Sequence, residues 1–477
     1  MAYNDCYQLF LQFINNQGVK EEEDVNVLMN RFFHNNNVPN LQLDFNAIKV
    51  ASHLVTLRKD ALQQFNNNNK TNNTIDIVQI TTTTSKTKYK KKDGVKFLSR
   101  EEFQKEYIYK NIPCLIRSIP EFQTVTQLWK SSSNPTSTIN TDWFCQKVGK
   151  DTMVPIRYNT TNNNTNNDIG LDDEGRSMEC QTKYISMLEW IQQQQQQQPP
   201  NGNDYLKDWH LQQFLEQQQQ QQEEELYQVP SIFPNDLFHQ FLRNYTIDKS
   251  DYRFVYWGPK TSRTELHSDV LHSFSWSYNV VGTKRWIFHV PNDNTTTTTN
   301  HTISVLQTAG DTMFVPSTWK HTVENMEETL SINHNWITAN IMDQMWDCIS
   351  VEQKAIQKEL RAWNNLSLQD YTIQETMLQS CCGINTTSFV LLLLTNCYKL
   401  ASLLRSSTTT TWETTFDLVC LYQVLKSIIV NHEDLQLQQR LEASCQSKQM
   451  ANNILHLSTM IIRIIDTNII RTTTTSN

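Results

Sequence analysis

The sequence predicts a mainly β fold with added helices, in which the middle of the chain forms a small all-β barrel or jelly roll. Residues 254–257 form an apolar, aromatic run, and residues 274–281 alternate large side chains with small or polar ones. Both patterns are typical of short strands. Gly282 and Thr283 then indicate a turn into a further strand at 284–288. Many short strands separated by turn signals favour a barrel or jelly roll over other all-β folds.

Helices are expected on both sides of the barrel. Residues 7–14 and 25–33 suggest short helices, and residues 341–363 and 388–464 show apolar side chains at three- and four-residue spacing. The C-terminal part should therefore pack as a helical bundle on the barrel or against another protomer. The predicted regions are 1–94 (N-terminal helices and low-complexity sequence), 95–340 (the barrel domain, with Asn-, Gln- and Thr-rich insertions) and 341–477 (C-terminal helices).

Polar low-complexity tracts interrupt the whole chain. Such tracts bury too little apolar area to offset the entropy lost on ordering, so most are expected to be surface loops. The tract at 292–300 lies between two predicted strands, which places it at a hairpin tip. The tract at 217–222 is also compatible with the extension of a helix that begins at Leu211. The tracts comprise residues 66–69, 159–167, 192–198, 217–222, 292–300 and 472–475.

The most informative motif is His267-Ser268-Asp269, which is followed far downstream by His321. Side chains alternate between the faces of a strand, so His267 and Asp269 should point the same way while Ser268 points away. The segment up to His321 is long enough for several short antiparallel strands that return the chain to the same place. Two imidazoles and one carboxylate would form the facial triad of a non-haem Fe(II) oxygenase, which leaves positions open for a chelating cosubstrate and oxygen.

A chance match to the tripeptide has to be considered. With 12 His and 49 acidic residues in 477 positions, about one His-x-acid match is expected by chance. The second match, His432-Glu433-Asp434, follows an apolar stretch at 425–430 that is interpreted as helix. Residues two positions apart on a helix do not face each other, so this second motif is predicted to be a solvated helix face.

Several motifs around the triad resemble the jumonji-C (JmjC) oxygenases. The resemblance covers residues 95–340, about half the chain, and implies a double-stranded β-helix, the cupin-like jelly roll of that family. Within the family the chain is most similar to a branch regarded as lysyl hydroxylases of the translation termination release factor. The motifs that carry the resemblance lie at residues 97–103, 111–116, 205–211, 251–259, 264–269, 275–277, 282–286, 310–316 and 331–336.

The resemblance also implies which residues bind the metal and the cosubstrate. His267, Asp269 and His321 would bind Fe(II), with 2-oxoglutarate and O2 as cosubstrates. Lys284 matches the lysine that pairs with the distal carboxylate of 2-oxoglutarate, for which a compact ammonium is suited. The neighbouring Arg285 is the alternative cation for that role. Further contacts implied in the same way are Thr264, which needs a bend in its strand to face the site, Tyr205, and Asn335 as a group that orients ligand or cosubstrate.

One position departs from the family pattern. Many relatives place an asparagine on the strand after the His-x-Asp motif, where this chain offers Ser275, Ser277 and, further along the same face, Asn279. The sequence leaves open which of the three contacts the cosubstrate.

Composition excludes some classes of function. The formal net charge is −8 and the pI about 5.9, so no basic field is expected to hold nucleic acid. The only dense basic run, residues 86–92, is interpreted as a solvated linker. The ten cysteines include no Cys-x-x-Cys pair, which argues against a structural zinc site.

Localisation is expected to be cytoplasmic or nuclear. No signal peptide is recognised at the start of the chain, and scattered cysteines are typical of a reducing compartment. The longest aliphatic run, 389–394, is far too short to span a bilayer and is expected in a buried helix. Oligomeric state is left open by the sequence.

Three functions are compatible with these motifs. The first is an Fe(II)- and 2-oxoglutarate-dependent hydroxylase of a protein substrate, with a lysine of a release factor as the target implied by resemblance. The second is a histone-type demethylase, in which hydroxylation of an N-methyl group releases formaldehyde. The third is a non-catalytic cupin-type module that holds a divalent ion, which would not need Lys284 or Tyr205.

Overall fold

A computed structural model of the chain describes most residues from 38 to 475. The helices expected at 7–14 and 25–33 and the motif at 432–434 lie outside the described residues. The described ranges are 38–69, 74–81, 91–92, 94–131, 139–159, 180–195, 204–218, 226–233, 235–245, 252–291, 301–362, 370–406, 412–431, 435–445 and 447–475.

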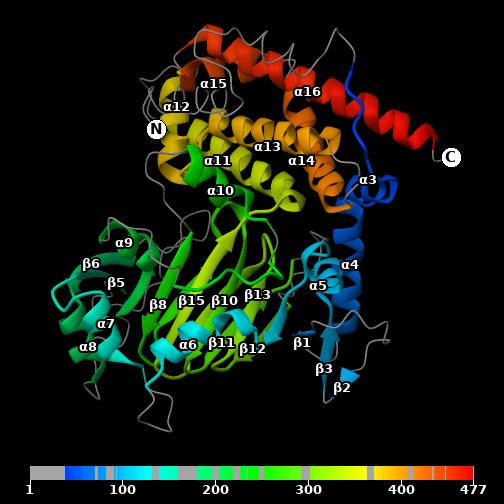
Figure 1. The fold of residues 1–477 in the computed structure, drawn as a ribbon. Helices are drawn as coiled ribbons and strands as arrows, with labels where there is room; N and C mark the ends of the chain where they lie inside the picture. The colour runs from blue at the N-terminus through cyan, green and yellow to red at the C-terminus, as the bar shows by residue number, and fades with distance from the viewer. Residues whose placement is uncertain are drawn as a thin grey trace.

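Eight consecutive strands form a jelly roll of two sheets (Figure 1). Strands β13, β10, β15 and β8 are neighbours in one sheet, and β12, β11, β14 and β9 form the other. This arrangement confirms the predicted fold class. The strands are β8 (Arg253–Gly258), β9 (Arg263–His267), β10 (Phe274–Val281), β11 (Lys284–His289), β12 (Thr302–Gln307), β13 (Asp311–Val315), β14 (Lys320–Asn325) and β15 (Thr329–Trp336).

The first sheet continues beyond the jelly roll on both sides, to eleven strands in all. On one side β4 pairs with β13, and β1 pairs in parallel with both β4 and β3. Strand β1 precedes residue 95 and nevertheless belongs to this sheet. On the other side β7, β5 and β6 follow β8. The added strands are β1 (Asp76–Ile80), β2 (Lys91–Lys92), β3 (Val95–Leu98), β4 (Cys114–Arg117), β5 (Met153–Asn159), β6 (Cys180–Ser186) and β7 (Tyr205–Trp209).

Short helices connect these outer strands and lie beside the barrel (Figure 1). Their buried faces are aromatic, with Phe103, Phe122, Trp129, Phe144 and Trp190 all fully buried. They are α5 (Arg100–Phe103), the π-helical turn η2 (Gln104–Ile108), η3 (Pro120–Phe122), α6 (Gln123–Trp129), α7 (Thr141–Lys147), α8 (Met187–Gln195) and α9 (Leu211–Gln218). A further helix, α10 (Leu237–Tyr245), lies between the barrel and the C-terminal helices (Figure 1), where it contacts β15 and α13.

The C-terminal helices form a bundle above one end of the barrel, as predicted (Figure 1). The N-terminal helix α3 packs against α14 of this bundle, so both ends of the described chain meet there. The N-terminal helices are α3 (Phe45–Ser52) and α4 (Leu54–Asn69). The C-terminal helices are η5 (Ala339–Ile341), α11 (Met342–Ala362), α12 (Tyr371–Cys382), α13 (Thr386–Ser406), α14 (Trp412–Asn431), α15 (Leu435–Cys445) and α16 (Lys448–Thr475).

Helix α13 contains the aliphatic run at 389–394, and all six of those residues are buried. By length and composition, Thr386–Arg405 is the one helix in the described part of the chain that could cross a membrane. In this fold 67% of that stretch is buried, where it forms the centre of the bundle. The run is therefore a core helix, as the sequence predicted.

Several polar tracts continue helices, although they were expected to form loops. Residues 66–69 end α4, residues 192–195 end α8, and residues 472–475 end α16. Each tract directly follows an amphipathic helical segment, and extending a helix costs far less free energy than nucleating a new one. In α16 the hydroxyl of Thr473 also donates to the carbonyl of Ile469 (2.9 Å).

Candidate active site

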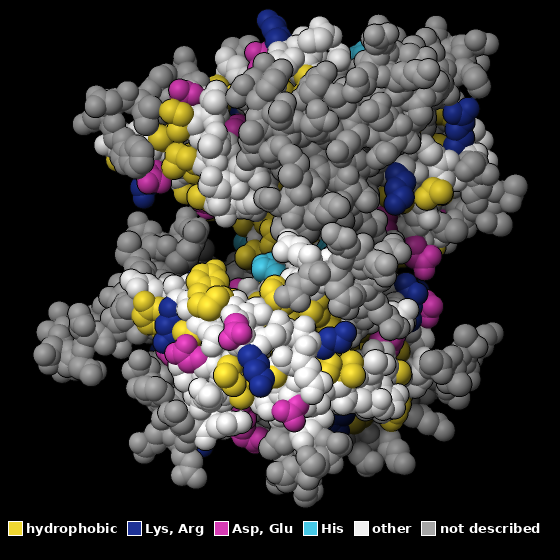
Figure 2. Space-filling model, turned by 60° about the vertical axis from the view of Figure 1, so that its left-hand side comes forward, with side chains coloured by type: hydrophobic (Ala, Val, Ile, Leu, Met, Phe, Trp, Pro, Cys, Tyr) yellow, Lys and Arg dark blue, Asp and Glu magenta, His cyan; other side chains and the backbone are white. Residues whose placement is uncertain are grey.

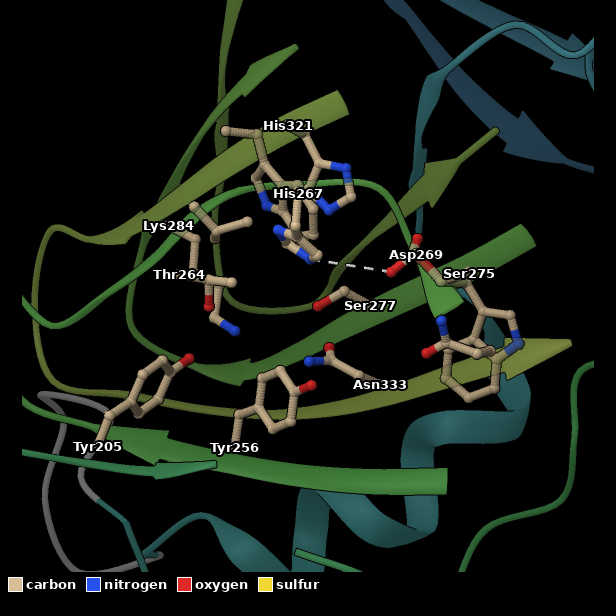
Figure 3. A pocket seen from close by; sticks show the side chains of 14 residues that line it. Tyr205, Tyr256, Thr264, His267, Asp269, Ser275, Ser277, Lys284, His321 and Asn333 are labelled. Atoms are coloured by element: carbon tan, nitrogen blue, oxygen red, sulfur yellow. Dashed lines mark hydrogen bonds and ion pairs between the residues drawn. The ribbon is translucent and has the colours of Figure 1, made fainter. Parts of the chain in front are cut away.

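The three predicted ligands come together at one end of the jelly roll (Figure 3). His321 on β14 lies directly opposite His267, the last residue of β9, and Asp269 follows with an extended backbone. The ligand atoms of the three side chains all lie within 4.8 Å of one another, and Nε2 of His267 is 4.0 Å from Oδ1 of Asp269. Two metal–ligand bonds of roughly 2.1 Å each would bridge most of the distance between any two of these ligand atoms.

Both imidazoles are held in the tautomer that suits a metal. Nδ1 of His267 lies 2.8 Å from the carbonyl of Glu265, and Nδ1 of His321 lies 3.0 Å from that of Trp319. A carbonyl oxygen only accepts, so each Nδ1 carries the proton and each Nε2 offers a lone pair. Burial, followed by the proximity of His321, lowers the pKa of His267, which keeps that ring neutral.

Asp269 is oriented by a hydroxyl. Oγ of Ser275 on β10 donates to Oδ2 of Asp269 at 2.7 Å, which leaves Oδ1 facing the two imidazoles. Two neutral imidazoles and one carboxylate with a free oxygen are the donor set that non-haem Fe(II) requires. The residues present therefore fit the metal.

A cavity between the two sheets leads from the triad to Lys284 (Figure 3). Lys284 is 1% exposed, and its ammonium donates to Oγ of Ser331 at 2.6 Å. Among the described residues, no carboxylate forms an ion pair with it. Burial, with a smaller effect of Lys207, lowers the pKa of Lys284 to about 7. A buried cation without an anionic partner suits the distal carboxylate of 2-oxoglutarate.

Thr264 and Tyr205 line the same cavity. The sequence required a bend for Thr264 to face the site, and the pairing of β9 with β14 shifts register between His321 and Val323. Such irregularities turn side chains toward a new direction. Tyr205 is buried and packs edge-on against Tyr256, with ring centroids 5.9 Å apart.

Asn335 also lines the cavity, whereas Asn279 does not. The amide of Asn335 donates to Oγ of Ser273 at 3.1 Å. Asn279 is fully buried, and its amide donates to the carbonyl of Gly282 at 2.6 Å. Asn279 keeps the regular register of β10 with β15, opposite Ser331, and its Oδ1 has no hydrogen-bond partner among the described residues. The cosubstrate contact of Asn279 therefore stays a prediction.

Arg285 points away from the cavity and pairs with Glu324. It therefore does not replace Lys284 as the buried cation.

Two polar residues that line the cavity, Asn333 and Tyr256, were not predicted from the sequence. Oδ1 of Asn333 and Oγ of Ser277 are buried and have no hydrogen-bond partner among the described residues. Buried polar atoms are rarely left unpaired, so both are suited to a bound cosubstrate. Asn333 could have been found by alternation, since it lies two residues before Asn335 on one strand. Tyr256 donates to Oδ1 of Asp208 at 2.9 Å.

We expect Ser275→Ala to weaken metal binding about tenfold and leave folding intact, because Asp269 loses the hydroxyl that orients it. Changes to groups that hold a metal ligand typically cost 10 to 100-fold. Titration of the metal-free protein with Co(II) measures the effect, and Ser277→Ala is the matched control. Equal Co(II) affinities for the two variants would contradict the role of Ser275.

Binding of 2-oxoglutarate should weaken as pH rises above about 7. Burial lowers the pKa of Lys284 to about 7, so the ammonium that pairs with the carboxylate is lost above that pH. The dissociation constant should then rise by up to about tenfold per pH unit. Titration calorimetry from pH 6.5 to 9 measures this slope, and a flat profile for the unmodified protein would contradict it. Lys284→Met should show the weaker affinity at every pH.

The jelly roll, the triad and the buried lysine together define an Fe(II)- and 2-oxoglutarate-dependent oxygenase. No protein-family model matches the chain. Sequence relatives do match, and five of them are named 2-oxoglutarate and iron-dependent oxygenase JMJD4 or its homolog. The Danio rerio protein is 32% identical over 43% of this chain and 52% of its own length. The Mus musculus protein is 30% identical over 61% of this chain and 70% of its own length. The Drosophila melanogaster homolog is 30% identical over 69% of this chain and 86% of its own length.

The chain therefore belongs to the JMJD4 family of JmjC oxygenases, which use Fe(II), 2-oxoglutarate and O2. Two more distant relatives carry other names. An Arabidopsis thaliana protein named arginine-specific demethylase JMJ20 is 28% identical over 62% of this chain and 67% of its own. A Caenorhabditis elegans protein named bifunctional arginine demethylase and lysyl-hydroxylase psr-1 is 26% identical over 52% and 61%.

Proposed function

We propose that the protein hydroxylates a lysine side chain of a protein substrate such as a translation termination release factor. The observation that carries the oxygenase chemistry is that one cavity is lined both by the triad and by the buried Lys284, whose ammonium bonds to a hydroxyl and to no carboxylate among the described residues. A module that only holds a divalent ion has no use for a buried cation, so the non-catalytic alternative is disfavoured. The lysyl target rests on the similarity to JMJD4 and on the name of the Caenorhabditis elegans relative.

The cavity residues divide the work of binding. His267, Asp269 and His321 would hold the iron, while Lys284, Tyr205 and Thr264 would hold the far end of 2-oxoglutarate. When bound, iron, 2-oxoglutarate and O2 supply the oxidising chemistry that no side chain provides. Buried aromatic walls, Trp276 and Trp286, keep water from the reacting atoms.

The substrate would enter from the side of His267. Its side chain is 37% exposed, and the adjacent Val270 is 51% exposed. Figure 2 shows a hollow between the barrel and the helical bundle, in which histidine and hydrophobic side chains are visible. An extended side chain such as lysine would reach the triad past the partly exposed His267. From the acidic net charge and the scattered cysteines, we also propose that the partner is a cytoplasmic or nuclear protein and that the enzyme makes no direct contact with nucleic acid.

A second candidate is N-demethylation. Hydroxylation of an N-methyl carbon gives a product that collapses with release of formaldehyde. The name of the Arabidopsis thaliana relative favours this outcome. The same iron and cosubstrate site serves both reactions, so only the product distinguishes them.

Mass spectrometry of the substrate tests the proposal. Purified release factor is incubated with enzyme, Fe(II) and 2-oxoglutarate, and formaldehyde is assayed in parallel. The proposal expects the mass of one oxygen atom on a single lysine, dependent on 2-oxoglutarate and absent with Asp269→Ala. Loss of a methyl group with formaldehyde would favour demethylation. Turnover of 2-oxoglutarate without any change in the release factor would reject that substrate and leave the oxygenase class intact.

A further inference from the structure

The turn that carries Asp269 has an unusual backbone. Asp269 caps the short helical turn η4 (Val270–His272), and the amide of His272 donates to the carbonyl of Asp269 at 3.1 Å. Leu271 and His272 are both left-handed, with φ values of 53° and 52°. Two consecutive left-handed residues with side chains are unfavourable, and such a conformation persists only where its surroundings impose it.

Groups from outside the turn hold it in this shape. Nδ1 of His272 lies 3.1 Å from the carbonyl of Gln344 in helix α11, so the imidazole donates to that carbonyl. The carbonyl of His272 accepts from Oγ of Ser317 at 2.5 Å, and Leu271 is buried in the main core. Of these contacts, the bond to Gln344 comes from the C-terminal bundle rather than from the barrel.

Helix α11 is itself fixed near this contact. Asp343, next to Gln344, pairs with the buried Arg58 of α4 at 2.6 Å. Trp346 stacks on Phe389 of α13, with ring centroids 5.3 Å apart and planes at 15°. The carbonyl that receives the imidazole therefore belongs to a rigid part of the bundle. The turn η4, which bonds to this carbonyl, is therefore held rigidly as well.

We propose that His272 is a positioning residue for the metal centre. Its bond to the carbonyl of Gln344 holds η4 in the left-handed conformation, and η4 in turn holds Asp269 within reach of His267 and His321. The helical region after the barrel thereby becomes part of the machinery that forms the iron site. A histidine that merely satisfies its own buried nitrogen would leave the metal affinity unchanged on removal.

Two substitutions separate the hydrogen bond from the backbone strain. In His272→Asn, the amide nitrogen occupies the place of Nδ1 and asparagine tolerates a left-handed backbone. In His272→Gly, the backbone is relieved of strain and the donor is lost. We expect Co(II) binding to the metal-free protein to stay within about twofold for the Asn variant. We expect it to weaken at least tenfold for the Gly variant, the range typical of groups that orient metal ligands.

The matched control is Thr261→Gly. Thr261 is also left-handed (φ 75°) but lies in the exposed turn between β8 and β9, away from η4. Thermal unfolding of all variants checks folding, and the visible absorption of bound Co(II) reports the ligand geometry. The proposal expects an altered Co(II) spectrum for His272→Gly alone. Wild-type Co(II) affinity in His272→Gly, or an equal loss in the Asn and Gly variants, would overturn it.

Discussion

Asp269→Ala is expected to abolish the conversion of 2-oxoglutarate to succinate. Asp269 is the only carboxylate in the triad, and its Oδ1 is the free oxygen that faces the two imidazoles. Loss of an anionic ligand should weaken Fe(II) binding at least tenfold, since changes to residues that only orient a ligand already lower metal affinity about 10 to 100-fold. Anaerobic Fe(II) titration and a succinate assay measure the two effects.

The second His-x-acid motif provides the control for this experiment. His432→Ala changes the motif that is predicted to be a solvated helix face, and it should retain full activity and metal content. Succinate production that persists in Asp269→Ala, or a loss of iron from a folded His432→Ala protein, would contradict the assignment of His267 and Asp269 as iron ligands.

Lys284→Ala should raise the Michaelis constant for 2-oxoglutarate at least tenfold while changing iron affinity little. Its ammonium is buried at the end of the cavity remote from the triad, so its loss removes a contact to the cosubstrate and none to the metal. Removing one partner of a buried charge pair typically costs about 2 to 5 kcal/mol. Initial rates at varied 2-oxoglutarate and saturating Fe(II) give the constant directly.

Two further variants sharpen this test. Lys284→Arg should restore binding only in part, because a planar guanidinium does not fit the space of an ammonium. Arg285→Ala carries the same loss of charge at the neighbouring position, whose side chain pairs with Glu324 outside the cavity. It should leave the Michaelis constant unchanged. An unshifted curve for Lys284→Ala would move the cosubstrate contact to another residue.

The sequence was sufficient to predict the jelly roll and the grouping of the three ligands. Both depend on the two-residue alternation of strands, which is a local property of the backbone. Lys284 and Thr264 were placed by resemblance, and the structure brings both to the cavity. Ser275 and Ser277 could not be told apart from sequence, because both share one face of β10. Their different tasks follow from which of them reaches Asp269.

Departures from regular pairing account for what the sequence did not predict. Asn279 was expected on the same face as Ser275 and Ser277, and its amide donates to the carbonyl of Gly282 just before the register of β10 with β15 shifts. The left-handed conformation of Leu271 and His272 is imposed by tertiary contacts. Neither residue is a glycine or an asparagine, the types that would have indicated it in the sequence. The polar tracts that extend helices have no apolar periodicity, so the sequence did not predict them as helix.

The pairing of β4 with β13 has a consequence for how the protein reaches this structure. Cys114 lies opposite Phe314, and β1 and β3 join the sheet only through β4. Contacts between residues so distant in sequence form slowly, because a long loop must close before they contribute. During synthesis these early strands emerge well before their partner and present an unpaired edge. We therefore expect a need for chaperone protection until β13 has left the ribosome, and slow refolding of the isolated protein.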